Sequence, residues 1–201
     1  MGALLAFPSI CRDYTDEFGG RKEGVSEMPD EARHTMAAYE EAWDVKLKQN
    51  LELPFSEFLN ADHVFPDIWL GGYSVAKDEQ FLGSREISTV VNMAVECDYR
   101  IDIPGVRLVK IGIEDGRLAR SGVFRKAAEV IHESLPSGRV FVHCAAGVSR
   151  SATAVLAYLN VYEKIGWADG VTRLRRQRPC VNPHPHLYRS LVRDIGSDFI
   201  Y

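Results

Sequence analysis

The residues best suited to chemistry in this chain are Cys144 and Arg150, which stand six positions apart between an apolar run and a helical run. The residues around them, 140–159, read VFVHCAAGVSRSATAVLAYL. VFVH predicts the end of a buried strand, and residues 149–166 predict a largely buried helix. A turn between a strand and a helix directs successive backbone N–H groups into one concavity and adds the positive end of the helix dipole. The stretch therefore predicts an anion site.

The side chains of this turn fit a phosphate group. Alanine and glycine at 145–147 are small, so a tetrahedral anion can approach the backbone, and glycine tolerates unusual dihedral angles. The guanidinium of Arg150 can bind two phosphate oxygens. A cysteine at a helix N-terminus near arginine ionises readily, and its thiolate is a strong nucleophile. We therefore predict that Cys144 attacks the phosphorus of a phosphate ester held by Ala145, Ala146, Gly147, Val148, Ser149 and Arg150.

Two serines flank Arg150, and either Ser149 or Ser151 can hydrogen-bond the sulfur and ease its departure when water cleaves a phosphocysteine. Ser151, directly after the arginine, is predicted to have this role. The alternative is that Cys144 is a buried structural residue beside a helix start. The whole string HCAAGVSRSA, between a strand and a long apolar helix, is far more specific than a cysteine and an arginine alone, and it favours the catalytic interpretation.

Hydrophobic periodicity predicts the elements that position this turn. Apolar, β-branched runs predict strands over 87–94, 105–113 and 139–143, and ADHVFPDIWLGG predicts one short strand ending at Gly71 and Gly72. Helical patterns occupy residues 74–82, 122–135, 149–166, 167–178 and 184–196. This alternation predicts an α/β fold with a twisted, mainly parallel sheet flanked by helices.

The N-terminal part of the chain has a different pattern. Residues 1–30 mix glycine, charge and proline without periodicity and predict a mobile tail. A helix over 31–50 follows, with one apolar face made by Met36, Tyr39, Trp43 and Leu47. That face is expected to pack on the domain, with a partner-binding helix as the alternative. The predicted organisation is an N-terminal extension over 1–58, a tail followed by an amphipathic helix, and a catalytic domain over 59–198.

Composition limits the functional classes. The 201 residues are 46% hydrophobic, enough for a full core, and the net charge of −4 offers no basic field, so we expect no nucleic acid and no membrane as partners. The four cysteines are widely separated, with no Cys-x-x-Cys pair, so neither a metal nor another cofactor is expected. MGALLAF lacks the basic start of a secretory signal. Free thiols in a reducing compartment, cytoplasmic and/or nuclear, are therefore expected.

HCAAGVSRSATAVLAYL resembles the signature of the cysteine-dependent dual-specificity protein phosphatases, and the resemblance extends over about residues 60–195. IWLGGYSVAKD, STVVNMA and RRQRPCVNPHPHLYRSL support it. It implies a small, atypical member with the protein tyrosine phosphatase-like fold. The implied activity is metal-independent hydrolysis of phosphate monoesters on phosphotyrosine and phosphoserine/phosphothreonine of proteins, through a phosphocysteine intermediate.

The resemblance also implies roles for residues outside the turn. A general acid should lie on a loop some thirty residues before the cysteine, and in KIGIEDGRLARSG this is Asp115, with Glu114 as the alternative. Asp-Gly is also an ordinary turn pair. His143 is expected to orient the loop and support the thiolate, and a structural role is compatible with this. Asn92, at the end of a strand, either hydrogen-bonds the loop or is only structural, and the structural interpretation is favoured.

NPHPHL, with His184 and His186, departs from the glycine or second asparagine that the family often has in this segment. The segment is remote from Cys144 in sequence, so this departure weakens the close family assignment and not the expected activity.

The turn carries no charge at Ala145, Ala146 or Val148, which favours a single phosphate on a protein over a highly charged head group. Two other functions remain open from the sequence: a phosphoprotein-binding module with weak turnover, and a lipid or glucan phosphatase. Preference between phosphotyrosine and phosphoserine/phosphothreonine is not predicted, and neither is the oligomeric state.

Overall fold

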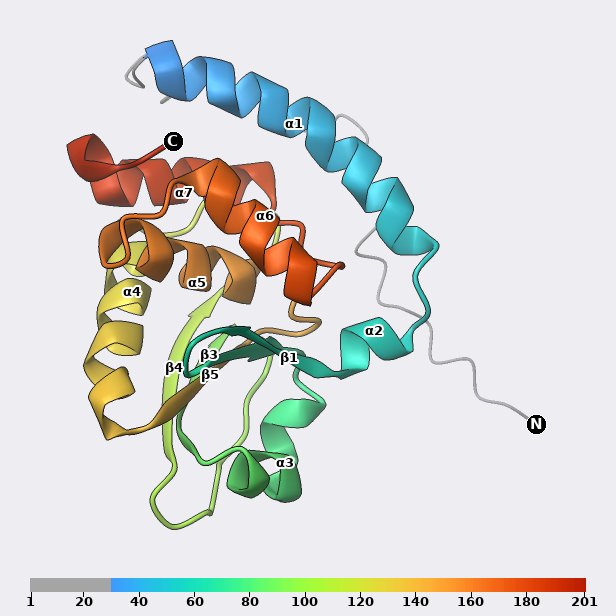
Figure 1. Cartoon of the computed structure of the whole chain (residues 1–201), viewed down its shortest axis with the longest axis vertical. Helices are drawn as coiled ribbons and strands as arrows, with labels where there is room; N and C mark the ends of the chain where they lie inside the picture. The colour runs from blue at the N-terminus through green and yellow to red at the C-terminus, as the bar shows by residue number, and fades with distance from the viewer. Residues whose placement is uncertain (1–29) are drawn as a thin grey trace.

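The computed structural model describes residues 30–201, with side chains described from Met36 onward (Figure 1). The predicted mobile tail therefore falls, apart from its last residue, outside the described residues. The remainder forms a mainly parallel sheet with helices on both faces, which confirms the predicted fold class.

The sheet has five strands in the order β1-β2-β5-β3-β4. Their bounds are β1 Ala61–Phe65, β2 Ile68–Gly71, β3 Ile87–Ala94, β4 Arg107–Ile113 and β5 Arg139–His143. β1 runs antiparallel to β2, and every other pairing is parallel. β5 is central, since Val142 pairs with Leu70 on one side and Val91 on the other. The continuous apolar character of β5 is the pattern of a strand buried on both faces.

The first predicted strand is wrong, because residues 61–71 form a hairpin of two strands. Pro66 cannot donate to a strand ladder, and Asp67 adopts a left-handed φ of 58°. The chain therefore reverses at these two residues. The turn brings Gly71, at the end of β2, beside the end of β5, where the predicted anion site begins.

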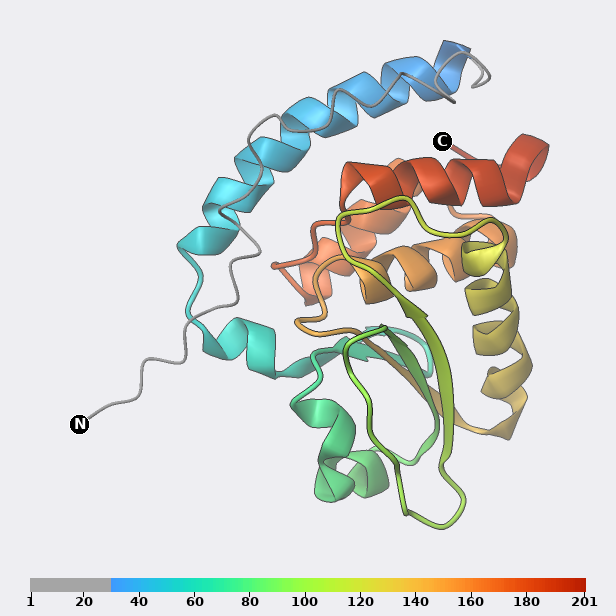
Figure 2. The ribbon, with the colours of Figure 1, turned by 180° about the vertical axis from the view of Figure 1, so that it is seen from behind.

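Seven α-helices lie in the described part of the chain: α1 Asp30–Leu51, α2 Ser56–Leu59, α3 Glu79–Ser84, α4 Val123–Ser134, α5 Arg150–Val161, α6 Trp167–Gln177 and α7 Pro185–Ile195. Helices α4 to α7 cover one face of the sheet and α3 covers the other (Figures 1 and 2). Residues of β5 alternate between the two faces: Val140 and Val142 join the core under α4 to α7, whereas Phe141 joins the core under α3.

Helix α1 packs on the outside of the domain through the face that the periodicity predicts. Met36 and Tyr39 are buried, and the helix arches over α7 (Figures 1 and 2). The Tyr39 hydroxyl donates to the Pro183 carbonyl at 2.6 Å. Trp43 packs its ring edge-on against His184, with centroids 5.0 Å apart. The helix therefore contacts the segment that leads into α7.

The parallel strands β3, β4 and β5 end at the same edge of the sheet. Asn92 on β3 lies opposite His143 on β5, and Ala94 at the end of β3 lies opposite Ile113 at the end of β4. Three connections therefore leave one edge together: residues 95–106 after β3, residues 114–122 after β4 and residues 144–149 after β5. Sites in open α/β sheets lie outside the carboxyl ends of the strands.

Candidate active site

The turn over residues 144–149, here called the phosphate loop, connects β5 to α5, as the sequence predicts. Gly147 has a φ of +67°, and a Cβ atom on it would lie 2.4 Å from the backbone carbon of Gly71. Real Cβ atoms do not approach a backbone atom so closely, so glycine is required for the loop to cross the end of β2.

Every carbonyl group of the phosphate loop is hydrogen-bonded to a neighbouring part of the protein. The donors are the His143 ring to Cys144 O (3.0 Å), Tyr73 N to Ala145 O (2.9 Å), Arg178 to Ala146 O (3.0 Å) and Gly147 O (2.8 Å), Asn182 N to Val148 O (2.9 Å) and Thr153 N to Ser149 O (2.9 Å). Within residues 30–201, the N–H groups of 145–149 have no acceptor. Buried N–H groups are rarely left unpaired, so this row of donors is suited to a bound anion.

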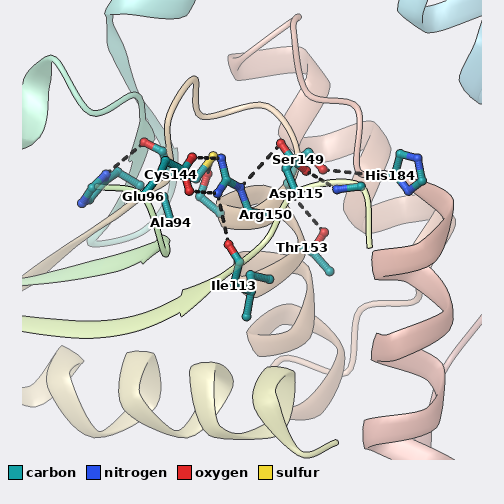
Figure 3. A network of polar contacts seen from close by, with 12 residues as sticks. Ala94, Glu96, Ile113, Asp115, Cys144, Ser149, Arg150, Thr153 and His184 are labelled. Atoms are coloured by element: carbon teal, nitrogen blue, oxygen red, sulfur yellow. Dashed lines mark hydrogen bonds and ion pairs between the residues drawn. The ribbon is translucent and has the colours of Figure 1, made fainter. Parts of the chain in front are cut away.

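The Arg150 guanidinium is 2% exposed and held from two sides (Figure 3). Its Nη1 and Nη2 each donate to one oxygen of the Glu96 carboxylate at 2.6 Å, and Nη1 also donates to the Ile113 carbonyl at 3.1 Å. Its Nε is buried and has no hydrogen-bond partner, although the Asp115 carboxylate lies 3.5 Å away. The Nε–H is therefore a donor still free for a phosphate oxygen.

The Cys144 sulfur lies at the base of this loop and is 1% exposed. Burial acts to raise the pKa of its thiol, as does the nearby Asp115 carboxylate. The charge of Arg150 and hydrogen bonds from Ser151 outweigh both and leave the thiol pKa below its ordinary value. The Ser151 hydroxyl donates to the sulfur at 3.2 Å, whereas the Ser149 hydroxyl accepts from the His184 N–H at 3.1 Å. Of the two serines, Ser151 is therefore the one beside the sulfur.

Asp115 lies on the connection after β4, and its side chain reaches Arg150 (Figure 3). One of its carboxylate oxygens faces the Arg150 Nε at 3.5 Å, and the other accepts from the Gly116 N–H at 3.0 Å. Its neighbour Glu114 is paired with Arg117 at 3.0 Å, where both side chains are more than half exposed. Of the two candidates for the general acid, Asp115 lies beside Arg150 and Glu114 does not.

His143 contacts the carbonyl of Cys144 and not its sulfur. A carbonyl only accepts, so the ring Nδ1 carries the proton and Nε2 accepts from the Tyr99 hydroxyl at 2.6 Å. Burial lowers the pKa of His143 to about 4; its hydrogen bond to the Cys144 carbonyl opposes this shift, and the charge of Arg150 adds to it. The neutral ring between Tyr99 and Cys144 fixes the first peptide group of the phosphate loop.

Of the two roles expected for Asn92, the hydrogen bond to the phosphate loop is wrong and the structural role is the one observed. Its side-chain amide donates to the Cys97 carbonyl at 2.8 Å and accepts from the Ala94 N–H at 2.9 Å. Asparagine at a strand end readily bonds local backbone groups, and here it closes the turn that carries Glu96.

Residues 182–187, remote from Cys144 in sequence, contact both the phosphate loop and the connection that carries Asp115. The His184 N–H donates to Ser149 in the phosphate loop, and the His186 ring donates to the carbonyl of Gly116, directly after Asp115.

The sequence analysis did not identify Glu96 and Arg178 as residues of the site. Arg178 stands in the quoted RRQRP string, but nothing in that string shows that its side chain reaches the phosphate loop. Glu96 follows the end of a strand, and its position near Arg150 depends on the strand order.

Within residues 30–201, no group of three or more His, Cys, Asp or Glu side chains is placed to hold a metal ion. None of the helices in that range is long and apolar enough to cross a membrane.

The structure thus brings a buried cysteine and a buried arginine together on one loop, at the carboxyl edge of a mainly parallel sheet. The family model "Dual specificity phosphatase, catalytic domain" matches residues 68–194. The chain therefore belongs to the dual specificity phosphatase family, as its signature resemblance implied, and it is a protein phosphatase of the tyrosine/dual-specificity type.

Proteins and solved structures similar to this chain support the family assignment. The chain is 29% identical over 144 residues to dual specificity protein phosphatase 18 of Rattus norvegicus, a match that covers 71% of this chain and 70% of that protein. It is 34% identical over 127 residues to dual specificity protein phosphatase 14 of Homo sapiens, covering 62% of this chain and 64% of that protein. Among solved structures, DUSP15 is similar with a TM-score of 0.61 and 27% identity over 68% of this chain and 87% of that one. Helix α1 lies outside the range of the family model.

Proposed function

We propose that this protein hydrolyses phosphate monoesters on phosphotyrosine and phosphoserine/phosphothreonine of protein substrates through a phosphocysteine intermediate. One observation carries the proposal: the Cys144 thiol, with its lowered pKa, shares one loop with a row of unpaired N–H groups and with a buried guanidinium whose Nε–H is free. An anion in the loop satisfies these donors, and the sulfur lies at the loop's base. Donors aimed at developing charge are the main source of electrostatic catalysis in such sites.

In the first half of the reaction, the Cys144 thiolate attacks phosphorus, and the bond from phosphorus to the ester oxygen breaks. That oxygen takes its proton from the Asp115 carboxyl group and leaves as the free hydroxyl of the substrate side chain. Arg150 and the loop N–H groups hold the three remaining phosphate oxygens. The 3.5 Å separation between the Asp115 carboxylate and the Arg150 Nε supports this role for Asp115.

In the second half, water attacks phosphorus and the phosphorus–sulfur bond breaks. The Asp115 carboxylate takes a proton from this water, inorganic phosphate is released, and the electron pair returns to the Cys144 sulfur. The Ser151 hydroxyl, 3.2 Å from that sulfur, stabilises the departing thiolate. The cycle restores every group and needs no metal.

The loop's lack of charged side chains supports a protein monoester over a phosphoinositide. Ala145, Ala146 and Val148 offer nothing to a second phosphate group. The two alternatives from the sequence, a lipid or glucan phosphatase and a phosphoprotein-binding module, are outcomes of the test below.

The test is hydrolysis of p-nitrophenyl phosphate with EDTA present, comparing the wild type with Cys144→Ser, Asp115→Asn and Glu114→Gln. We expect Cys144→Ser to be inactive, Asp115→Asn to lose about 10²- to 10⁴-fold in kcat and Glu114→Gln to keep wild-type rates. Equal rates for wild type and Cys144→Ser contradict the proposal. An inactive wild type that binds phosphopeptides supports the binding module, and faster hydrolysis of phosphoinositides or phosphorylated glucan than of phosphopeptides supports the lipid or glucan phosphatase.

A further inference from the structure

We propose that His186 is a positioning residue for the general acid: its ring ties the connection that carries Asp115 to the first turn of α7. This inference rests on the proposed role of Asp115 and adds a residue that the family resemblance does not supply. The segment NPHPHL departs from the family pattern at this position.

The contact itself has a defined direction. The His186 Nδ1 lies 2.9 Å from the Gly116 carbonyl oxygen, and since a carbonyl only accepts, Nδ1 carries the proton. Gly116 adopts a left-handed φ of +67°, which only glycine adopts readily. Its N–H donates to the Asp115 carboxylate at 3.0 Å. The hydrogen bond from His186 therefore holds Gly116, the residue that follows Asp115 and whose N–H orients the Asp115 carboxylate.

His186 is itself held by the start of α7. Pro185 occupies the first turn of this helix, and the Nδ1 of His184, the N-cap residue, accepts from the His186 N–H at 3.1 Å. Burial lowers the pKa of His184 to about 4, and electrostatic interactions with His186 and Arg189 add to the shift, which is consistent with an Nδ1 that accepts the capping hydrogen bond. His186 is thus a donor on a capped helix and not on a loose loop.

The same turn of α7 also holds the phosphate loop. The His184 N–H donates to the Ser149 hydroxyl at 3.1 Å, two residues before the contact of His186 with Gly116. Nucleophile and acid lie on connections from two different strands, and this turn joins the two connections. The distance between the Cys144 sulfur and the Asp115 carboxylate is therefore set in part by His184 and His186.

Loss of the tether should weaken proton donation more than nucleophilic attack. Misplacing a catalytic group by about 1 Å can cost about 10²-fold in rate. The loss is largest when the departing oxygen is basic, because an acidic phenol leaves without help from a proton donor. Phenyl phosphate, whose leaving group has about the basicity of tyrosine, needs the acid, whereas p-nitrophenyl phosphate needs it far less.

The experiment measures kcat/KM of the full chain on both substrates for wild type, His186→Ala, His186→Asn and Asp115→Asn, with His63→Ala as the control. His63 is an exposed histidine on β1. We expect His186→Ala to lose about 10-fold or more on phenyl phosphate and less than about 3-fold on p-nitrophenyl phosphate. His186→Asn, whose amide nitrogen can occupy the Nδ1 position, should recover most of the loss, and His63→Ala should match wild type.

The ratio of the two rates within each variant is independent of the folded fraction, so partial unfolding of His186→Ala does not obscure the result. An unchanged ratio in His186→Ala, beside a changed ratio in Asp115→Asn, overturns the inference and leaves the proposed function intact. A ratio that His186→Asn fails to restore also counts against it. If Asp115→Asn itself keeps the wild-type ratio, the proposed role of Asp115 fails instead.

Discussion

At the scale of single residues, the site depends on two buried groups, Cys144 and Arg150, and on the half-exposed carboxylate of Glu96. Burial alone opposes ionisation of Cys144, and the charge of Arg150 reverses the effect. Arg150 is itself buried and keeps its charge because Glu96 accepts two hydrogen bonds from it. Burial acts to raise the pKa of Glu96, but Arg150 outweighs it and holds the carboxyl pKa below its usual value. The ionisation of all three groups is therefore coupled.

The first prediction concerns the ionisation of Cys144. The ultraviolet absorbance of its thiolate, taken as wild type minus Cys144→Ser, should rise with pH through a midpoint below the value of about 8.5 for free cysteine. Activity should fall on the acidic side of the same midpoint, because the protonated thiol is a weak nucleophile. Ser151→Ala removes a hydrogen bond to the sulfur and should move the midpoint upward. A midpoint at or above that of free cysteine contradicts the electrostatic argument.

The second prediction concerns Glu96, which holds two nitrogens of Arg150 without lying on the phosphate loop. Glu96→Gln removes the negative charge and turns an amide group toward the guanidinium, so Arg150 loses its fixed orientation. Hydrogen bonds to charged groups contribute about 1.5–3 kcal/mol, so kcat/KM on p-nitrophenyl phosphate and affinity for vanadate should both fall roughly 10- to 100-fold. The control is Asp98→Asn on the same connection, an exposed partner of Lys110. Equal vanadate affinity for the two variants rules out the positioning role.

At the scale of elements, the phosphate loop has its shape because three segments surround it. β2 ends against Gly147, Tyr73 binds the Ala145 carbonyl, and Arg178 binds two further carbonyls from the far side. Arg178 is anchored in turn by the Asn60 side chain at 2.6 Å. Because these hydrogen bonds hold the carbonyl groups of the phosphate loop, its N–H groups remain available to bind an anion.

The third prediction tests the close crossing of the phosphate loop over β2. Gly147→Ala places a Cβ atom against the Gly71 backbone at a positive φ, so it should cost about 1–3 kcal/mol of unfolding free energy and displace the loop, with loss of activity. Gly83→Ala in α3 is the matched control, because nothing lies within 4 Å of its added Cβ. Helix propensity makes that change stabilising by about 0.5–1 kcal/mol. Urea unfolding and p-nitrophenyl phosphate rates measure both, and equal effects would refute the steric argument.

The hydrophobicity pattern of the sequence predicts a helix or strand well when the whole segment has the same degree of burial. The bounds expected for β3 and β5 agree with the structure, because both strands are buried on two faces and rich in β-branched residues. The β1–β2 hairpin was missed because Pro66 and Asp67 interrupt a run that is otherwise apolar. Cys144, Arg150 and Ser151 are readable because they lie on one contiguous turn. Glu96 and His186 come from other connections, and only the strand order and the packing of α7 bring them to the site.

At the scale of the whole molecule, helix α1 belongs to the same packed unit as the active site, although the family model does not reach it. Asn50 near its end donates to the Cys180 carbonyl at 2.7 Å, and the Trp43 carbonyl accepts from the Asn182 side chain at 3.3 Å. Residues 180–186 in turn bind the phosphate loop through the Asn182 N–H. Contacts therefore run from the N-terminal helix to the catalytic loop through one short segment.

The last prediction follows from this chain of contacts. Trp43→Ala removes the ring that packs edge-on against His184, so we expect a loss of about 2 kcal/mol in unfolding free energy and a fall in kcat, as the start of α7 loosens. Val45→Ala changes the opposite side of the same helix, where the side chain is 57% exposed, and should stay within about 0.5 kcal/mol. Urea unfolding followed by circular dichroism should give a single transition for both variants, because α1 shares its buried face with α7. A separate early transition for α1, or wild-type kcat in Trp43→Ala, would mean that the helix is an independent appendage and that the catalytic loop does not depend on it.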